Sequence, residues 1–145
     1  MRIVLDTNVL VSGILSPHGP PGRILDLAVR GDLHVLYDDR ILAEYREVLG
    51  RPKFALRPED VAQVLGQLER TGEAVSASPV SVTLDDEDDL PFLEVSVSGA
   101  SDALITGNAA DLEPVRGSHG ARVVSPRELM DEITQPADPS PGPRK

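Results

Sequence analysis

Met1-Arg2-Ile3-Val4-Leu5-Asp6-Thr7-Asn8-Val9-Leu10, the first ten residues of the chain, change from one hydrophobic pattern to another. Residues 2–5 form a short aliphatic run, which is typical of a buried strand. The run ends at three polar residues, of which Thr7 or Asn8 is suited to cap a helix that extends to Leu15. The carboxylate of Asp6 is therefore expected directly beyond the carboxyl end of a buried strand.

Beyond this stretch, short apolar runs alternate with segments of helical periodicity. Further strands are predicted at residues 33–37, 103–106 and 122–124, with a weak strand or an extended link near Val80 and Val82. Pro and Gly residues predict a loop at 16–22. Helices are predicted at residues 24–30, 41–49, 58–71, 89–98 and 126–133. Because strands alternate with helices, the sequence predicts an α/β fold with a mostly parallel sheet of four or five strands.

Polar and glycine residues mark the ends of several of these helices. Asp38 or Asp39 is suited to cap the helix over 41–49. Ser125 and Glu128 form a capping-box pattern at the start of the last helix. Gly31 is expected to end the first of the helices that follow the loop.

The composition is that of a single compact domain. The chain has 145 residues, 40% of them hydrophobic, and no cysteine. This excludes a disulfide framework and a thiolate metal site, and it fits a reducing compartment. No apolar run approaches the roughly 20 residues that cross a bilayer, so a cytoplasmic protein without membrane association is expected. Prolines recur from Thr134 onward, so we expect a folded domain over 1–133 and a disordered tail over 134–145.

The charge balance limits the possible functions. With 14 basic and 24 acidic residues, the net charge is −10, which argues against a broad basic surface for nucleic acid. Acids gathered in one pocket give a second interpretation, because a divalent cation relieves their mutual repulsion. The distribution of the acids therefore decides between the two interpretations.

Several acids are expected at one edge of the sheet. Asp6 follows the first strand, and Asp111 lies shortly beyond the strand over 103–106. Ligands of open parallel sheets bind beyond the carboxyl ends of the strands. Helical spacing of about 100° per residue places Glu44 at the flank of the buried face of its helix. We therefore expect these three carboxylates to lie close together.

The acidic run over 85–89 leads into the helix that contains Phe92. The same helical spacing places Asp89 on the inner face of that helix, at its start, where the helix dipole favours a carboxylate. Asp88 is expected on the flank and Glu94 on the outer face. Residues 85–87 are interpreted as a solvated loop and helix cap.

Carboxylates that converge on one edge of a sheet suit hard cations such as Mg²⁺ and Mn²⁺, which prefer oxygen ligands. Such ions activate a water molecule and stabilise the charge that develops at a phosphodiester. The sequence therefore predicts a metal-dependent phosphodiester hydrolase in which four acids hold the metal: Asp6, Glu44, Asp89 and Asp111.

Taken in order, these motifs resemble the PIN domain family. They are residues 1–12, the acid in Leu42-Ala43-Glu44-Tyr45, residues 85–94 and the segment Leu104-Ile105-Thr106-Gly107-Asn108. The resemblance covers residues 1–133, and it is greatest to a branch of toxin components of toxin–antitoxin systems related to VapC-type toxins. It implies a three-layer α/β/α fold and an Mg²⁺- or Mn²⁺-dependent ribonuclease site of three or four acids.

Carried over by position, the resemblance assigns the site acids as Asp6, Glu44, Asp89 and Asp111. Asp88 and Asp86 compete with Asp89 for the third position. Asn108 stands where many members carry an Asp, so either its amide oxygen coordinates the metal or Asp111 acts alone. Three further polar residues match side chains that line the family's pocket: Thr7, Asn8 and Thr106.

Each of these residues also has an ordinary interpretation. Asp6 could simply cap a helix, and Glu44 could form a surface pair with Arg40, four residues earlier. Arg51 and Lys53 form the best local basic patch and are candidates for phosphate binding, although charges beyond a helix end are usually solvated.

Two other functions compete with the nuclease. A phosphotransfer domain of the receiver or haloacid dehalogenase type also places acids at strand ends, but it needs a lysine in the pocket, and neither Lys53 nor Lys145 follows a predicted strand. A PIN-like module that has lost activity and acts through a protein partner is the second alternative. For an active toxin, the resemblance implies an RNA substrate, a cognate antitoxin protein and a homodimer.

Overall fold

The computed structural model describes residues 1–81, 84, 87–107 and 122–134. Strands and helices alternate along the chain, as predicted. The strands are β1 (Arg2–Leu5), β2 (His34–Tyr37), β3 (Glu73–Ala74), β4 (Ala103–Ile105) and β5 (Val123–Val124). The helices are α1 (Thr7–Leu15), α2 (Pro20–Val29), α3 (Asp39–Leu49), α4 (Pro58–Thr71), α5 (Leu90–Ser98) and α6 (Pro126–Thr134), with 3₁₀ turns at Pro52–Phe54 and Glu87–Asp89.

The five strands form one sheet in the order β3-β2-β1-β4-β5, and every neighbouring pair is parallel. The predicted α/β fold with a parallel sheet is therefore confirmed. Because all strands point the same way, their carboxyl ends lie at one edge. The residues that follow β1, β2, β4 and β5 at that edge are polar: Asp6, Asp38, Thr106 and Ser125.

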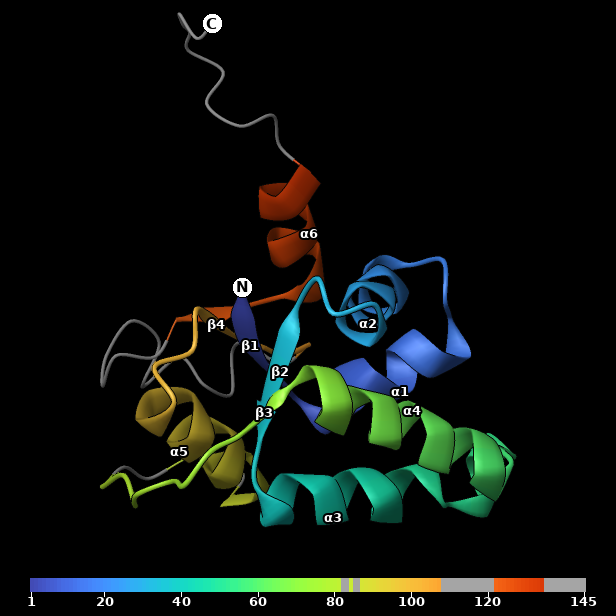
Figure 1. Cartoon of the computed structure of the whole chain (residues 1–145), viewed down its shortest axis with the longest axis horizontal. Coiled ribbons are helices and arrows are strands. Elements are labelled where there is room, and N and C mark those ends of the chain that lie inside the picture. Colours follow the sequence, from blue (N-terminus) through green and yellow to red (C-terminus); the bar gives the residue numbers. More distant parts are fainter. Residues whose placement is uncertain (82–83, 85–86, 108–121, 135–145) are drawn as a thin grey trace, which may run out of the picture.

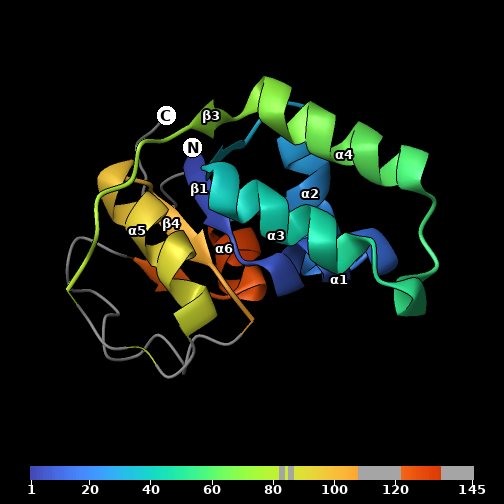
Figure 2. The same ribbon diagram turned by 90° about the horizontal axis from the view of Figure 1, so that it is seen from below.

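Helices cover both faces of the sheet, which gives three layers. Helix α5 lies on one side, and α1, α2 and α4 lie on the other (Figures 1 and 2). Helix α3 continues from β2 beyond the carboxyl edge of the sheet (Figure 1). The central strands β1 and β4 are almost wholly buried, as is typical of a parallel sheet covered on both faces. The core is aliphatic, with Tyr45 and Phe92 its largest buried side chains.

Several predicted helix ends are confirmed by their hydrogen bonds. The carboxylate of Asp38 caps α3 by accepting from the backbone N–H of Ile41 at 3.1 Å. The capping box at α6 is complete. Ser125 Oγ accepts from the N–H of Glu128 at 3.1 Å, and Glu128 Oε1 accepts from the N–H of Ser125 at 2.8 Å. Gly31, just beyond α2, has a φ of +86°, which only glycine adopts without strain.

Two local predictions were wrong. The N-cap of α1 is Asp6, not Thr7 or Asn8. Helix α2 begins at Pro20, inside the predicted loop, because proline needs no N–H partner in a first helical turn. Near Val80 the chain forms no strand, which agrees with the predicted link. The strand that the sequence pattern missed is Glu73–Ala74, which pairs with β2. Val82 lies outside the described residues.

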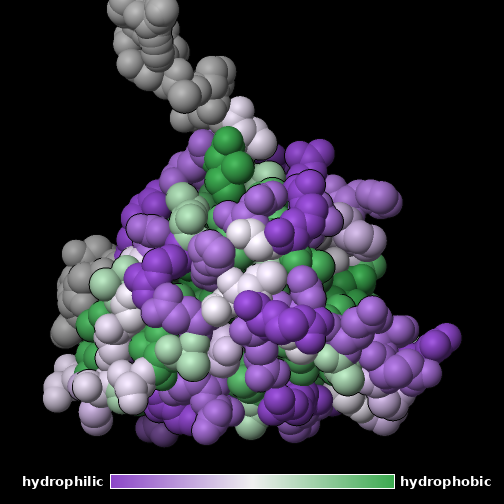
Figure 3. Space-filling view, in the orientation of Figure 1, coloured by the Kyte–Doolittle hydropathy of each residue, from purple (hydrophilic) through white to green (hydrophobic). Residues whose placement is uncertain are grey.

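The surface is mainly polar. On the face drawn in Figure 3, hydrophilic residues are interspersed with small apolar areas. The large exposed hydrophobic residues in the described ranges are Met1, Leu15 and Ile133. No described helix has the length and apolar character needed to cross a membrane. Helix α6 ends at Thr134, one residue past the expected domain boundary, and residues 135–145 lie outside the described part.

Candidate active site

The Asp6 carboxylate lies at the point in the sheet where successive strands begin to be added on the other side of β1. From the central strand β1 the chain adds β2 and β3 on one side, and β4 and β5 on the other. The junction of β1 and β4 is therefore a topological switch point, where α/β sheets bind ligands. Asp6 follows β1 and is 8% exposed, and Thr106 follows β4 and is 1% exposed. The Thr106 hydroxyl donates to Asp6 Oδ2 at 2.8 Å.

The Asp6 side chain does not act as a helix cap, although Asp6 occupies the N-cap position of α1. Its backbone carbonyl accepts from the N–H groups of Val9 and Leu10, but its carboxylate makes no capping bond. Asp38, at the same position of α3, does cap with its side chain. The ordinary interpretation of the Asp6 carboxylate is therefore not supported, since it bonds to the neighbouring strand end instead.

Glu44 is held beside Asp6 through Thr7. The Thr7 hydroxyl donates a short hydrogen bond to Glu44 Oε2, and Thr7 directly follows Asp6. The alternative surface pair with Arg40 is not formed, because Arg40 bonds to Asp38 and Glu94. Helix α3 thus presents a half-buried carboxylate to the start of α1, at the flank that the helical spacing predicted.

Tyr45 lies under these two carboxylates and was expected only as an apolar core residue. It is fully buried, and its hydroxyl donates to the backbone carbonyl of Leu5 at 2.6 Å. Burial raises the pKa of the Tyr45 hydroxyl strongly, and the negative charges of Asp6 and Glu44 raise it further. The charges of Asp6 and Glu44 therefore both reach the buried hydroxyl of Tyr45. The pattern of apolar residues in the sequence could not show this.

Replacing Tyr45 by Phe is expected to lower the free energy of unfolding by about 1–2 kcal/mol, because the buried Leu5 carbonyl loses its donor. Urea unfolding measures the change. Tyr37→Phe is the matched control, since the Tyr37 hydroxyl makes a longer bond, 3.3 Å, to the carbonyl of Glu69 in a half-buried position. Equal losses of stability in the two variants would show that the Tyr45 hydrogen bond stabilises the fold no more than the Tyr37 hydrogen bond does.

Helix α5 positions Asp89, the third predicted acid, at its start. Asp89 is half-buried at the N-cap of α5 without a capping bond from its side chain, and Asp88 beside it is exposed. In the parts of the chain that are described, no group of three or more Asp, Glu, His or Cys side chains is close enough to hold a metal ion. Three predicted site residues or alternatives lie outside the described residues: Asp86, Asn108 and Asp111.

The carboxylate oxygens of Asp6 and Glu44 are suitable ligands for a hard divalent cation. Both are carboxylates, and Mg²⁺ is commonly bound through one or two carboxylates, with waters and substrate phosphates completing its ligands. Each carboxylate accepts a bond from a threonine hydroxyl, Thr106 for Asp6 and Thr7 for Glu44. Such outer contacts orient metal ligands. The pair is therefore chemically suited to Mg²⁺ or Mn²⁺.

The predicted basic patch is partly neutralised. Arg51 forms an ion pair with Glu47 at 2.8 Å, and Lys53 Nζ lies 5.1 Å from the centre of the Phe54 ring. The hydrogen bond with Glu47 raises the pKa of Arg51, and the charge of Glu44 contributes as well. The charge of Glu44 therefore reaches Arg51, while Glu47 is exposed on the same helix.

Comparisons with known proteins agree with this fold. A protein of Methanocaldococcus jannaschii, Uncharacterized protein MJ1680, is 29% identical over 151 aligned positions, which cover 92% of each chain. A chain in the crystal structure of VapBC2 from Rickettsia felis, bound to a DNA fragment from their promoter, has the same fold with a TM-score of 0.55. It is 15% identical, and the match covers 86% of this chain and 98% of that chain.

The PIN domain family matches residues 2–110, which include both β1 with Asp6 and β4 with Thr106. This match extends over well more than half of the chain. The switch-point carboxylate and its threonine thus lie inside the matched region, and the protein belongs to the PIN domain family.

Proposed function

We propose that the protein is a divalent-metal-dependent endoribonuclease that hydrolyses RNA phosphodiester bonds. The observation that carries the proposal is the buried Asp6 carboxylate at the switch point, bonded to Thr106 rather than to its own helix. Glu44, held by Thr7, provides a second carboxylate at the same place. Members of the PIN domain family are typically metal-dependent nucleases, which agrees with this donor set.

Each residue has a distinct proposed role. Mg²⁺ or Mn²⁺, when bound, supplies activation of a water molecule and stabilises the charge that develops at the phosphodiester. Asp6 and Glu44 bind the metal, and Thr7 and Thr106 orient these two carboxylates. Asp89 and Asp111 complete the acid set, with Asp88 and Asn108 as the alternatives for the third and fourth positions. Asn8, exposed in the first turn of α1, is available to contact the substrate.

We expect only a few basic side chains of this protein to take part in RNA binding. Most arginines in the described ranges are paired with acids, as Arg51 is with Glu47 and Arg57 with Glu59. Arg51 and Lys53, near α3, are the proposed phosphate contacts. A homodimer is included in the proposal because the resemblance to the PIN domain family implies one. A toxin role with a cognate antitoxin is included because the fold matches a chain of the VapBC2 complex.

A catalytically inactive binding module is the second candidate. It rests on one feature of the sequence: Asn108 stands where many members of the family carry an Asp. Such a module would fold with Asp6 and Glu44 in place, would bind no divalent ion tightly, and would act through a protein partner.

The proposal is tested with purified full chain, single-stranded and structured RNA, and Mg²⁺, Mn²⁺ or EDTA. Cleavage is expected with either metal and not with EDTA. Glu44→Gln should slow it by about 10²-fold, a loss typical of removing one electrostatic contact of an active site. Glu59→Gln is the matched control, because Glu59 is exposed on α4 and its partner Arg57 is not a proposed phosphate contact. It should keep wild-type activity.

The two candidates give different results in this experiment. If the wild-type chain cleaves no RNA and calorimetry detects no Mn²⁺ binding, the nuclease proposal is wrong and the binding module is favoured. If Glu59→Gln is as inactive as Glu44→Gln, the acid pair is not the site.

A further inference from the structure

Glu94 is a buried acid that the sequence pattern placed on the outside of α5, and that expectation was wrong. It is 6% exposed, between the core residues Leu93 and Val95. A carboxylate buried in this way is costly unless it is paired and hydrogen-bonded. Its Oε1 accepts from Arg40 Nη1 at 2.7 Å, and its Oε2 accepts from the backbone N–H of Val80 at 3.0 Å.

The outer face of α5 is covered by the segment that follows β3. Besides the bond from Val80 to Glu94, the backbone N–H of Ser78 donates to the hydroxyl of Ser98, one turn farther along α5, at 2.9 Å. Two side chains of α5 therefore hold this extended segment on the helix. Figure 1 shows the segment after β3 running alongside α5.

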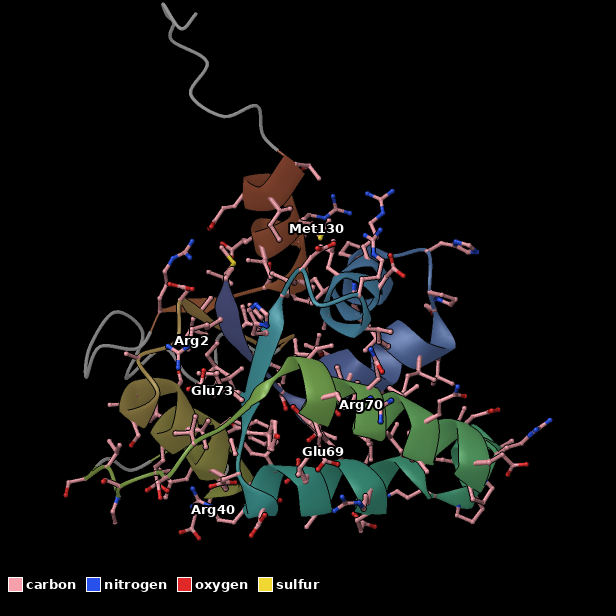
Figure 4. All side chains as sticks on the ribbon, in the orientation of Figure 1. Arg2, Arg40, Glu69, Arg70, Glu73 and Met130 are labelled. Carbon is pink, nitrogen blue, oxygen red and sulfur yellow. The ribbon has the colours of Figure 1, made fainter. Side chains whose placement is uncertain are left out.

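Arg40 connects Glu94 to the start of α3. Its guanidinium also bonds to Asp38, with Nε 2.9 Å from Oδ2, and Asp38 is the residue that caps α3. Figure 4 shows Arg40 at the beginning of α3, on the side that faces α5. The hydrogen bond with Glu94 does most to raise the pKa of Arg40, and the hydrogen bond with Asp38 raises it further. The ion pair therefore joins α3 to α5 directly.

The two helices joined by this pair carry the second and third proposed acids. Arg40 precedes Glu44 by four residues, so both lie on one face of α3. Glu94 follows Asp89 by five residues, within one and a half turns of the start of α5. The position of Asp89 relative to Glu44 thus depends on how α5 is held against α3.

We propose that the Arg40–Glu94 pair is a positioning device that sets where the Asp89 carboxylate lies relative to Asp6 and Glu44. This inference rests on the proposed metal-dependent function. Asp89 stands at the start of α5, so the packing of α5 against α3 sets the distance from its carboxylate to Glu44. Arg40 and Glu94 touch neither substrate nor metal, and they act through Asp89.

The test uses full-chain variants Arg40→Gln and Glu94→Gln, each assayed for Mn²⁺ binding by calorimetry and for RNA cleavage. Both are expected to weaken Mn²⁺ binding by about 10-fold, as mutations in the support of metal ligands do. They should lower kcat and leave the KM for RNA unchanged, because substrate contacts are not altered. Arg40→Lys, which keeps the charge, should recover most of the Mn²⁺ affinity.

Arg46→Gln is the matched control. Arg46 lies on the same helix and pairs with Glu69 at 3.6 Å, which joins α3 to α4 rather than to α5. Because this pair is exposed, the variant should have little effect on thermal stability and none on Mn²⁺ affinity.

The outcomes separate this inference from the proposed function. If Mn²⁺ binding requires Asp6 but is unchanged in folded Arg40→Gln and Glu94→Gln, the positioning role is wrong and the metal site stands. If the wild-type chain binds no Mn²⁺, both are wrong.

Discussion

Replacing Asp6 by Asn is expected to lower metal-dependent RNA cleavage by at least about 10²-fold and to abolish tight Mn²⁺ binding. Asn has the same shape as Asp, and its side-chain oxygen can still accept the bond from Thr106 that the structure shows at 2.8 Å. The variant therefore removes a charge from a site that is only 8% exposed and leaves the packing unchanged. Without that charge, a divalent cation loses a proposed ligand that is almost wholly buried.

The control for this prediction is Asp26→Asn, the same chemical change at an exposed position of α2. Asp26 pairs only weakly with Arg30, at 3.3 Å between side chains that are both more than half exposed. This variant should cleave RNA at the wild-type rate. A folded Asp6→Asn protein with full activity would remove Asp6 from the active site and overturn the proposed function.

Gly72→Ala is expected to lower the free energy of unfolding by about 2–3 kcal/mol, the range typical of overpacking. Gly72 ends α4 just before β3. A Cβ there would lie 2.2 Å from the carbonyl oxygen of Val35 and 2.6 Å from that of Leu68. Both are backbone atoms of the core, so β2 or the last turn of α4 must move to make room. Urea unfolding gives the change in stability.

Gly66→Ala provides the opposite case on the same helix. The nearest atom to a Cβ at Gly66 is Nη1 of Arg70, at 3.5 Å, an ordinary contact with a flexible side chain. Because alanine has the better helix propensity, this variant should gain about 0.5–1 kcal/mol. If both variants change stability in the same direction, the close approach of Gly72 to β2 is not the reason for a glycine at that position.

The sequence by itself determined the architecture of this protein. The aliphatic run of residues 2–5 gives β1, and the capping patterns at Asp38 and Ser125 begin α3 and α6 as predicted. These signals are local, since they depend on side-chain periodicity and on bonds between residues three positions apart. The position of Asp6 beyond the first strand was predictable for the same reason, because a strand end and the parallel order of the sheet fix the edge at which it lies.

Only the tertiary structure decided which side chains meet across elements. The bond between Thr106 and Asp6 spans a hundred residues, and the helix-cap interpretation of Asp6 could be tested only once that bond was seen. Glu94 shows the reason most clearly. Helical spacing gives the direction of a side chain but not what covers it. The segment after β3 and Arg40 cover the face of α5 that was expected to be solvated, and they pair its buried Glu94 carboxylate.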